Sequence, residues 1–185
     1  GERGQGPTGG AWAMGERAGR RRGREMPTDG DCRRFMRRAI ELARVHREAG
    51  EGGPVGAVVV KDGQIVAEGW NRVTSSQDPT AHAEVVAIRQ ACRKLGTFQL
   101  RGCEIYTSCE PCPMCLAAVY WARLDRLWYA NGRADAAAIQ FDDDWLYREV
   151  VLPAEARSLP SRQLLREEAL DVFRAWAQKP DKTPY

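Results

Sequence analysis

The sequence predicts a layered α/β domain in which helices pack on a sheet whose later strands run parallel. Short apolar runs rich in β-branched residues alternate along the chain with longer segments in which apolar residues recur every three or four positions. Strands that alternate with helices form such layers, because each apolar face must be covered by another element. Residues 29–185 are long enough for one such domain with its own core.

Residues 1–28 differ from the rest of the chain in composition. They are rich in Gly and Arg and carry no periodic apolar pattern, so we expect an unstructured leader or a tag remnant. Six Arg and three Glu among residues 1–25 account for the net charge of +3 of the whole chain. The remainder is neutral overall, which argues against a nucleic-acid partner. No apolar run approaches the roughly 18 residues of a membrane span, so we expect a soluble cytoplasmic enzyme without a membrane partner.

The first elements are a helix and a hairpin. Over residues 31–49 apolar positions follow helical spacing and stop at Gly50, which predicts an amphipathic helix. Residues 56–60 and 65–70 are short apolar runs, and the turn residues 61–63 between them predict two antiparallel strands.

The second half of the chain supplies the parallel strands. Residues 103–107 and 127–130 are expected to be strands, each next to one of two central helices that begin near residues 82 and 112. The remaining elements are a short helix over residues 133–139, an irregular segment over 149–161 and a last helix over 167–178.

The chemistry is concentrated in two short motifs, His82-Ala83-Glu84 and Cys112-Pro113-Met114-Cys115. One imidazole and two thiolates are three ligands for Zn²⁺, and a zinc ion with three protein ligands keeps a fourth position open for water. Glu84 lies two positions after His82 and does not share its helix face, so it is free to carry protons.

Both motifs are expected at helix N-termini. Thr80 is the predicted N-cap of the first central helix, and Pro111 and Pro113 open the second. The positive end of a helix dipole favours a thiolate over a thiol, which prepares the cysteines for a metal ion.

His-x-Glu followed by Pro-Cys-x-x-Cys is the pattern of the zinc-dependent nucleobase deaminases. A purely structural zinc, closed by Cys109 as a fourth ligand, is the alternative, but it leaves Glu84 without a task. Six clustered cysteines are too few for a disulfide scaffold. His46 has no partner at ligand spacing, so we expect it at the border of the first helix and not at a metal.

Polar groups near the motifs indicate what binds there. Asn71 follows the second strand and precedes a polar loop, residues 74–78; its amide offers a donor and an acceptor to a flat heterocycle. A carboxylate from the acidic run 142–144 accepts hydrogen bonds only, which suits the two adjacent donors of guanine and repels phosphate.

A closer resemblance covers residues 31–185. The segments that carry it are Gly52-Gly53-Pro54, Asn71, Asp78 to Glu84, Thr107 to Cys115, Tyr120-Trp121-Ala122-Arg123, Phe141-Asp142-Asp143 and Tyr185. Together they resemble the bacterial guanine deaminases of the cytidine deaminase-like superfamily. The zinc motif is common to the superfamily, and the segments around Trp121, Asp143 and Tyr185 favour guanine.

The resemblance implies a three-layer α/β/α sandwich with a five-stranded mixed sheet. It also implies a homodimer in which residues 141–185 are exchanged between subunits. The activity implied is hydrolytic deamination of guanine to xanthine and ammonia in purine metabolism. Its expected residues are His82, Cys112 and Cys115 for Zn²⁺, Glu84 and Asp143 for catalysis, and Asn71, Ala83, Trp121 and Tyr185 for contacts to the purine base.

One position departs from the family pattern. The family usually has Phe where this chain has Val55, and loss of a stacked ring costs about 1 to 3 kcal/mol of binding. Guanosine or another purine nucleoside therefore stays open as the substrate. Two further alternatives are a tRNA adenosine deaminase, disfavoured by the neutral C-terminal part, and a non-catalytic zinc-binding module.

Overall fold

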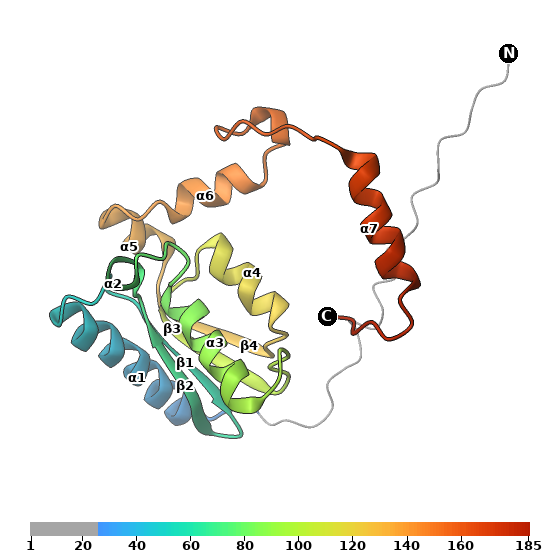
Figure 1. The fold of residues 1–185 in the computed structure, drawn as a ribbon. Coiled ribbons are helices and arrows are strands. Elements are labelled where there is room, and N and C mark those ends of the chain that lie inside the picture. Colours follow the sequence, from blue (N-terminus) through green and yellow to red (C-terminus); the bar gives the residue numbers. More distant parts are fainter. Residues whose placement is uncertain (1–25) are drawn as a thin grey trace, which may run out of the picture.

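The computed structural model describes residues 26–185, in which helices lie on both faces of one sheet (Figure 1). Most of the predicted leader, residues 1–25, falls outside the described residues. In chain order the elements are α1 (Asp29–Glu48), β1 (Gly56–Lys61), β2 (Gln64–Trp70), α2 (Val73–Ser76), α3 (Ala83–Leu95), β3 (Cys103–Cys109), α4 (Pro113–Trp121), β4 (Arg126–Asn131), α5 (Arg133–Ala138), α6 (Asp143–Val150), η1 (Ala154–Ala156) and α7 (Arg166–Gln178).

The sheet is mixed, with the strand order β2-β1-β3-β4. Strand β1 pairs antiparallel with β2 and β3, and β3 pairs parallel with β4, which confirms the predicted hairpin and parallel strands. Because β2 and β3 both run opposite to β1, their carboxyl ends lie at the same edge of the sheet. This edge receives the two motifs, since α3 follows β2 and α4 follows β3.

The expectation of five strands is wrong: the sheet described over residues 26–185 has four. After β4 the chain enters the Ala-rich segment 133–138, whose residues favour a helix, and it continues through α6 and α7. The C-terminal segment therefore adds helices beside the sheet and no edge strand.

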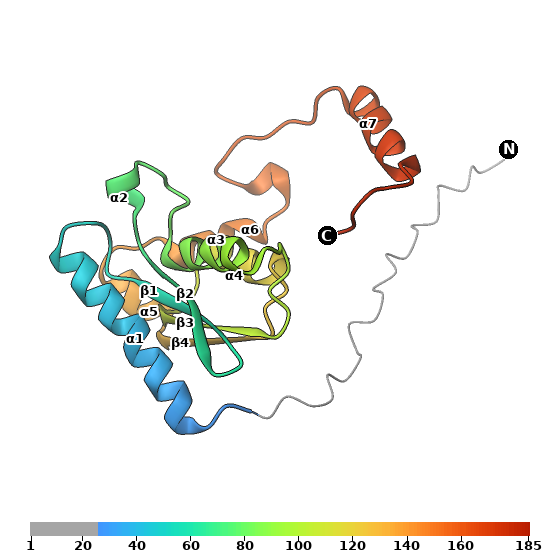
Figure 2. The same cartoon turned by 60° about the horizontal axis from the view of Figure 1, so that its bottom comes forward.

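Alternating side chains of the strands form the two halves of the core. Val58, Val60 and Tyr106 pack with Phe35 and Leu42 of α1 on one face. On the other face, residues of the same strands pack under α3 and α4; they include Ala57, Val59, Ile105, Ala87, Ala91 and Val119. Figure 2 shows α1 on one side of the sheet and α3 and α4 on the other, which confirms the three-layer α/β/α arrangement.

Two helix starts differ from the prediction. Helix α1 begins at Asp29 because Thr28 is its N-cap, and the Thr28 hydroxyl accepts a hydrogen bond from the Asp31 amide at 3.1 Å. Thr80 does not cap α3; its amide and hydroxyl both donate to Asp78, and His82 takes the N-cap position. The polar loop before them also contains the short helix α2.

The C-terminal segment is the least buried part of the described chain. No side chain of α6 or α7 is buried, and α7 stands apart from the sheet in both views (Figures 1 and 2). Its exposed apolar residues include Val172, Phe173 and Trp176. Within residues 26–185, no helix is both long and apolar enough to cross a membrane.

Candidate active site

The two motifs meet at the start of α3 and α4. His82 is the N-cap of α3, Cys112 is the N-cap of α4, and Cys115 lies in the first turn of α4. The prediction that both ligand sets lie at helix N-termini is thus confirmed. Gly69 of β2 makes this possible, because a Cβ atom there would lie 2.3 Å from the carbonyl oxygen of Ala83.

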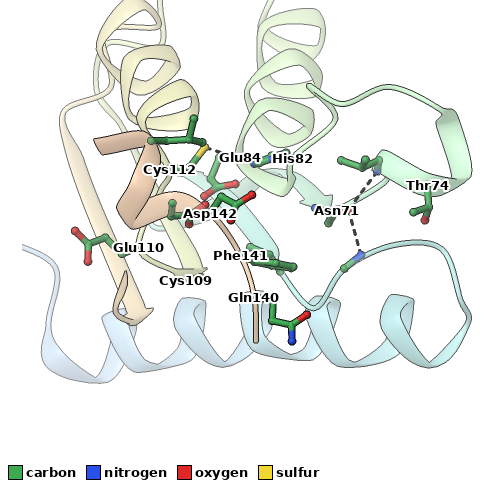
Figure 3. A pocket seen from close by; sticks show the side chains of 15 residues that line it. Asn71, Thr74, His82, Glu84, Cys109, Glu110, Cys112, Gln140, Phe141 and Asp142 are labelled. Atoms are coloured by element: carbon green, nitrogen blue, oxygen red, sulfur yellow. Dashed lines mark hydrogen bonds between the residues drawn. The ribbon is translucent and has the colours of Figure 1, made fainter. Parts of the chain in front are cut away.

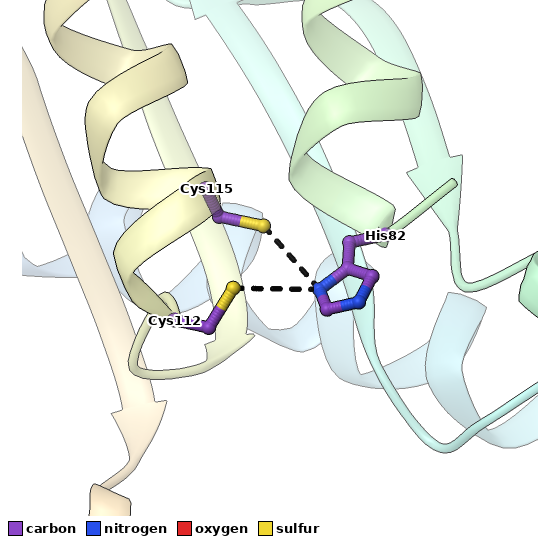
Figure 4. A group of neighbouring side chains, drawn as sticks. All are labelled: His82, Cys112 and Cys115. Carbon is purple, nitrogen blue, oxygen red and sulfur yellow. Dashed lines mark hydrogen bonds between the residues drawn. The ribbon is translucent and has the colours of Figure 1, made fainter. Parts of the chain in front are cut away.

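The three side chains converge on one point (Figure 4). The Cys112 and Cys115 sulfur atoms lie 3.6 and 3.5 Å from Nδ1 of His82. A tetrahedral zinc ion, with bonds of about 2.1 Å to nitrogen and about 2.3 Å to sulfur, places such ligand atoms about 3.6 Å apart. Donor set and spacing both fit Zn²⁺, and in residues 26–185 this is the one cluster of its kind.

The three candidate ligands are hydrogen-bonded to one another, and these bonds shift their pKa values. Hydrogen bonds from Cys115 and from His82 lower the pKa of Cys112 to about 4. The hydrogen bond with Cys112 raises the pKa of His82 and, together with burial, that of Cys115. A zinc ion takes a neutral imidazole and thiolates as ligands, so its binding would release the protons that these three groups share.

Cys109 does not complete this cluster. It lines the neighbouring cavity, and burial raises the pKa of its thiol to about 11. The three-ligand set without Cys109 supports an open zinc site over a closed structural one. All six cysteines of the chain lie in the described part, and no disulfide joins any of them there.

A cavity of about 390 Å³ adjoins the metal ligands (Figure 3). Its walls are formed by Gly53, Val55, Asn71, Val73, Thr74, His82, Glu84, Cys109, Glu110, Cys112, Gln140, Phe141, Asp142, Asp143 and Leu146. This volume is typical of a small-molecule site.

Glu84 lies beside the candidate zinc ligands. Its side chain points into the cavity next to Cys112 and His82, and the residue is 3% exposed (Figure 3). Burial raises the pKa of its carboxyl group above the ordinary value.

Asn71 enters the cavity from the end of β2. Its Oδ1 atom accepts hydrogen bonds from the amides of Gly53, at 3.1 Å, and Val73, at 3.2 Å. These bonds fix the side-chain amide, so that its nitrogen is left to donate to a ligand. Gly52 is required for the close approach, since a Cβ atom there would lie 2.0 Å from the Asn71 carbonyl oxygen.

Asp143 opens α6 and faces the cavity from the opposite part of the chain. Burial raises the pKa of its carboxyl group, and the negative charge of Cys112 acts in the same direction. Of the acidic run 142–144, Asp142 and Asp143 line the cavity and Asp144 pairs with Arg148.

Three predicted base contacts lie outside the cavity wall of the single chain. Ala83 is buried in the first turn of α3. Trp121 at the end of α4 and Tyr185 are largely exposed, and their rings contact each other. Their roles toward the base stay predictions.

Sequence reasoning missed part of the wall. Val73 and Thr74 come from α2, and Gln140, Phe141 and Leu146 come from the segment around α6. Phe141 is the only Phe, Tyr or Trp among the lining residues, and it follows Gln140, whose φ of 66° lies in the left-handed region. Tertiary contacts impose this backbone conformation at Gln140, so no local sequence pattern predicts it.

His46 does not belong to the candidate ligand cluster found in residues 26–185. Its ring stacks on Trp70 at 3.6 Å between centroids, and its Nδ1 atom lies 3.1 Å from Glu51.

A three-layer α/β/α fold that presents one His and two Cys at adjacent helix N-termini, with a buried Glu beside them, defines a zinc-dependent deaminase. Comparison with known proteins agrees. Residues 30–131 match the family model described as the cytidine and deoxycytidylate deaminase zinc-binding region.

Guanine deaminases are similar to this chain over most of its length. The guanine deaminase of Bacillus subtilis (strain 168) is 54% identical over 151 residues, which is 82% of this chain and 97% of the relative. A crystal structure of Bacillus subtilis guanine deaminase superposes with a TM-score of 0.80, covering 83% of this chain and 98% of that one at 54% identity. A solved structure of guanine deaminase from Nitrosomonas europaea superposes with a TM-score of 0.58 at 32% identity. The match covers 82% of this chain and 86% of that one.

The chain therefore belongs to the cytidine and deoxycytidylate deaminase family, in the group that includes the guanine deaminase of Bacillus subtilis. A tRNA-specific adenosine deaminase of Aquifex aeolicus is 44% identical, but over 96 residues, or 52% of this chain and 63% of the relative.

Proposed function

We propose that this protein is a zinc-dependent guanine deaminase, which hydrolyses guanine to xanthine and ammonia. The observation that carries the proposal is Asp143 in the cavity wall opposite Asn71, in a C-terminal segment that the similarity to guanine deaminase includes. An acceptor on one side and an amide donor on the other suit a base with donors on its pairing edge and a carbonyl oxygen beside them.

His82, Cys112 and Cys115 would hold the zinc ion, which when bound would lower the pKa of a water molecule and so supply the nucleophile. Glu84 accepts the proton of the attacking water and passes it to a ring nitrogen next to carbon 2 of the base. The C–O bond forms as this proton arrives. Glu84 then takes the remaining proton of the added hydroxyl group and delivers it to the amine, so that a C=O bond forms at carbon 2, the C–N bond breaks and ammonia leaves.

Asn71 and Asp143 hold the base in place. The amide nitrogen of Asn71 donates to the purine, and the carboxylate of Asp143 accepts from it. Orientation of the carbon to be attacked is worth several kcal/mol, because it removes the entropy cost of aligning base and water.

The test is ammonia release from the zinc-loaded full chain, with guanine, guanosine and adenosine in parallel. Turnover of guanine, with none of either nucleoside, is the expected result. Turnover of guanosine with equal efficiency would instead assign a nucleoside deaminase. If zinc is bound and no substrate reacts, the chain is a zinc-binding module and the proposal fails.

We further propose that the enzyme is a homodimer that exchanges residues 141–185. The exposed apolar side chains of the segment support this, because a chain rarely leaves several large apolar groups together in water; they include Val151, Leu164, Leu165, Val172, Phe173 and Trp176. In an exchanged dimer these groups pack on the partner subunit, and the contacts that Asp143 and Tyr147 make within the single chain are made between the two subunits instead.

Complementation between subunits tests the exchange. Glu84→Gln and Asp143→Asn variants are each inactive or impaired as homodimers. If residues 141–185 are exchanged, co-refolding the two variants restores one complete site per mixed dimer, with a quarter of the wild-type activity in an equimolar mixture. If light scattering gives the molar mass of a monomer, the exchange is excluded, while the deaminase assignment is unaffected. A location in the cytoplasm and the absence of a nucleic-acid partner stay predictions.

A further inference from the structure

Helix α6 carries Asp143, yet little of it is buried in the domain. None of its side chains is fully buried, and the segments on its C-terminal side lie away from the sheet (Figure 1). A carboxylate that must meet a base in a defined place needs a helix that is held in place. The contacts that hold α6 are therefore part of the site.

One such contact is made by Tyr147, which lies one turn after Asp143 and so on the same helix face. Its hydroxyl donates a hydrogen bond of 2.8 Å to the carbonyl oxygen of Pro111. Pro111 is fully buried and directly precedes the zinc ligand Cys112. Tyr147 thus ties the face that bears Asp143 to the backbone of the cysteine loop.

A second contact secures the ring of Tyr147. The guanidinium carbon of Arg133 lies 4.5 Å from the centroid of this ring. The same guanidinium pairs with Glu110, with 3.1 Å between Nε and Oε1. The amide of Arg133 also donates to Oε2 of Glu110, at 3.2 Å.

Glu110 is itself anchored at the start of the cysteine loop. Its amide donates a hydrogen bond of 2.7 Å to the carbonyl oxygen of Asn131, where β3 and β4 end side by side. Arg133 therefore lies between a fixed carboxylate and the ring of Tyr147. An isolated ion pair at the surface contributes little, but this one is connected to the backbone at both ends.

We propose that Glu110, Arg133 and Tyr147 form a clamp that holds α6 against the cysteine loop and so sets the position of Asp143 over the cavity. They are positioning residues, which act on the base through Asp143. The inference rests on the proposed function, in which Asp143 contacts the purine. A displacement of about 1 Å in a positioned group can cost up to about a hundredfold in rate, so loss of the clamp is expected to be measurable.

Three variants probe the clamp and one controls for it. Tyr147→Phe removes only the hydroxyl group, and Arg133→Met removes the cation. Arg133→Lys keeps the positive charge but lacks the flat guanidinium group. Arg148→Met is the matched control, because Arg148 lies on the same helix and pairs with Asp144 one turn away without reaching the cysteine loop.

The first readout does not depend on activity. Hydrogen exchange of the α6 amides is measured in the zinc-loaded full chain. Tyr147→Phe and Arg133→Met are expected to speed this exchange, Arg133→Lys less so, and Arg148→Met is expected to leave it close to wild type. Unchanged exchange in Arg133→Met and Tyr147→Phe would overturn the clamp whatever the enzyme acts on.

The second readout is kcat/KM for guanine, in the wild-type and the Asp143→Asn backgrounds. Arg133→Met should lower kcat/KM by about tenfold in the wild type and by nothing further in Asp143→Asn, because both changes act on one group. Equal losses in the two backgrounds would show a merely structural role and overturn the inference. A wild-type enzyme that does not deaminate guanine would refute the proposed function instead, and hydrogen exchange would still decide on the clamp.

Discussion

The ring of Tyr185 lies 5.9 Å from the ring of Trp121, centroid to centroid, at an interplanar angle of 43°. Trp121 ends α4, the helix that has Cys112 as its N-cap and Cys115 in its first turn. The C-terminal tail thus returns to the helix that holds two zinc ligands, although α7 before it stands apart from the sheet. Both rings remain largely exposed in the single chain, at 61% for Trp121 and 71% for Tyr185.

This contact predicts that Tyr185→Ala raises KM for guanine while zinc content stays at one per chain. An aromatic pair contributes about 0.5 to 1.5 kcal/mol beyond burial, which corresponds to a rise of about two- to tenfold in KM. Tyr185→Phe keeps the ring and should stay close to wild type. Steady-state kinetics on the three proteins decides: equal KM values for Tyr185→Ala and wild type would show that the tail does not act on the site.

Glu84→Gln is expected to abolish turnover but leave zinc binding intact. The amide has nearly the same shape as the carboxyl group but cannot carry a proton, and the ligand set His82, Cys112 and Cys115 is unchanged. The loss should reach about a hundredfold or more in kcat. Zinc content by atomic absorption accompanies the assay, and the control is Glu41→Gln in α1, where Glu41 pairs with Arg44 and does not line the cavity. Turnover near the wild-type rate would refute the proton-carrier role.

Val55→Phe is expected to lower KM for guanine. Val55 lines the cavity, so a ring at this position can stack on a flat base, which is worth about 1 to 3 kcal/mol. Val55→Leu adds apolar volume without a ring and is the matched control. An improvement in Val55→Leu equal to that in Val55→Phe would indicate simple filling of the cavity. A higher KM in Val55→Phe alone would mean that Phe141 already occupies that space.

The zinc ligands could be predicted from the sequence because their geometry follows from topology. His82 and Cys112 are far apart in the chain, but β2 and β3 both run opposite to β1, so the helices that follow them begin at one edge. Residue type at helix starts and strand direction suffice for this part of the site. The capping of α3 was less accessible, since local preference favours Thr80 over His82, and the hydrogen bonds of Thr80 to Asp78 overrule that preference.

The opposite wall of the cavity could not be predicted in the same way. Phe141 and Asp143 reach the site through a left-handed residue, Gln140, and through the contact between Tyr147 and Pro111. These are interactions between distant segments and leave no periodic signal. The prediction of a fifth strand was wrong for a related reason. It came from the family resemblance, whereas the residues after β4 favour helices.

The last prediction concerns pH and the pair that joins α1 to β2. Arg38 contacts Glu68 through two hydrogen bonds, from Nε to Oε1 at 2.7 Å and from Nη2 to Oε2 at 2.8 Å. These bonds lower the pKa of Glu68 below its ordinary value of 4.5. A carboxyl group whose pKa is lower in the folded than in the unfolded chain stabilises the fold at higher pH, and this stabilisation is lost as the pH falls through the folded-state pKa.

Glu68→Gln is therefore expected to lower the melting temperature at pH 7 and to have little effect at pH 3. The pair is partly exposed, with 44% of the Arg38 side chain and 31% of the Glu68 side chain accessible, so solvent screens it. Its contribution should not exceed about 1 kcal/mol, or about 2 to 4 °C for a domain of this size. Glu155→Gln, in the exposed turn η1, is the control. Thermal unfolding at the two pH values is the measurement, and an equal loss at both would assign the effect of Glu68→Gln to packing, because only the ionised carboxylate can form the bidentate pair.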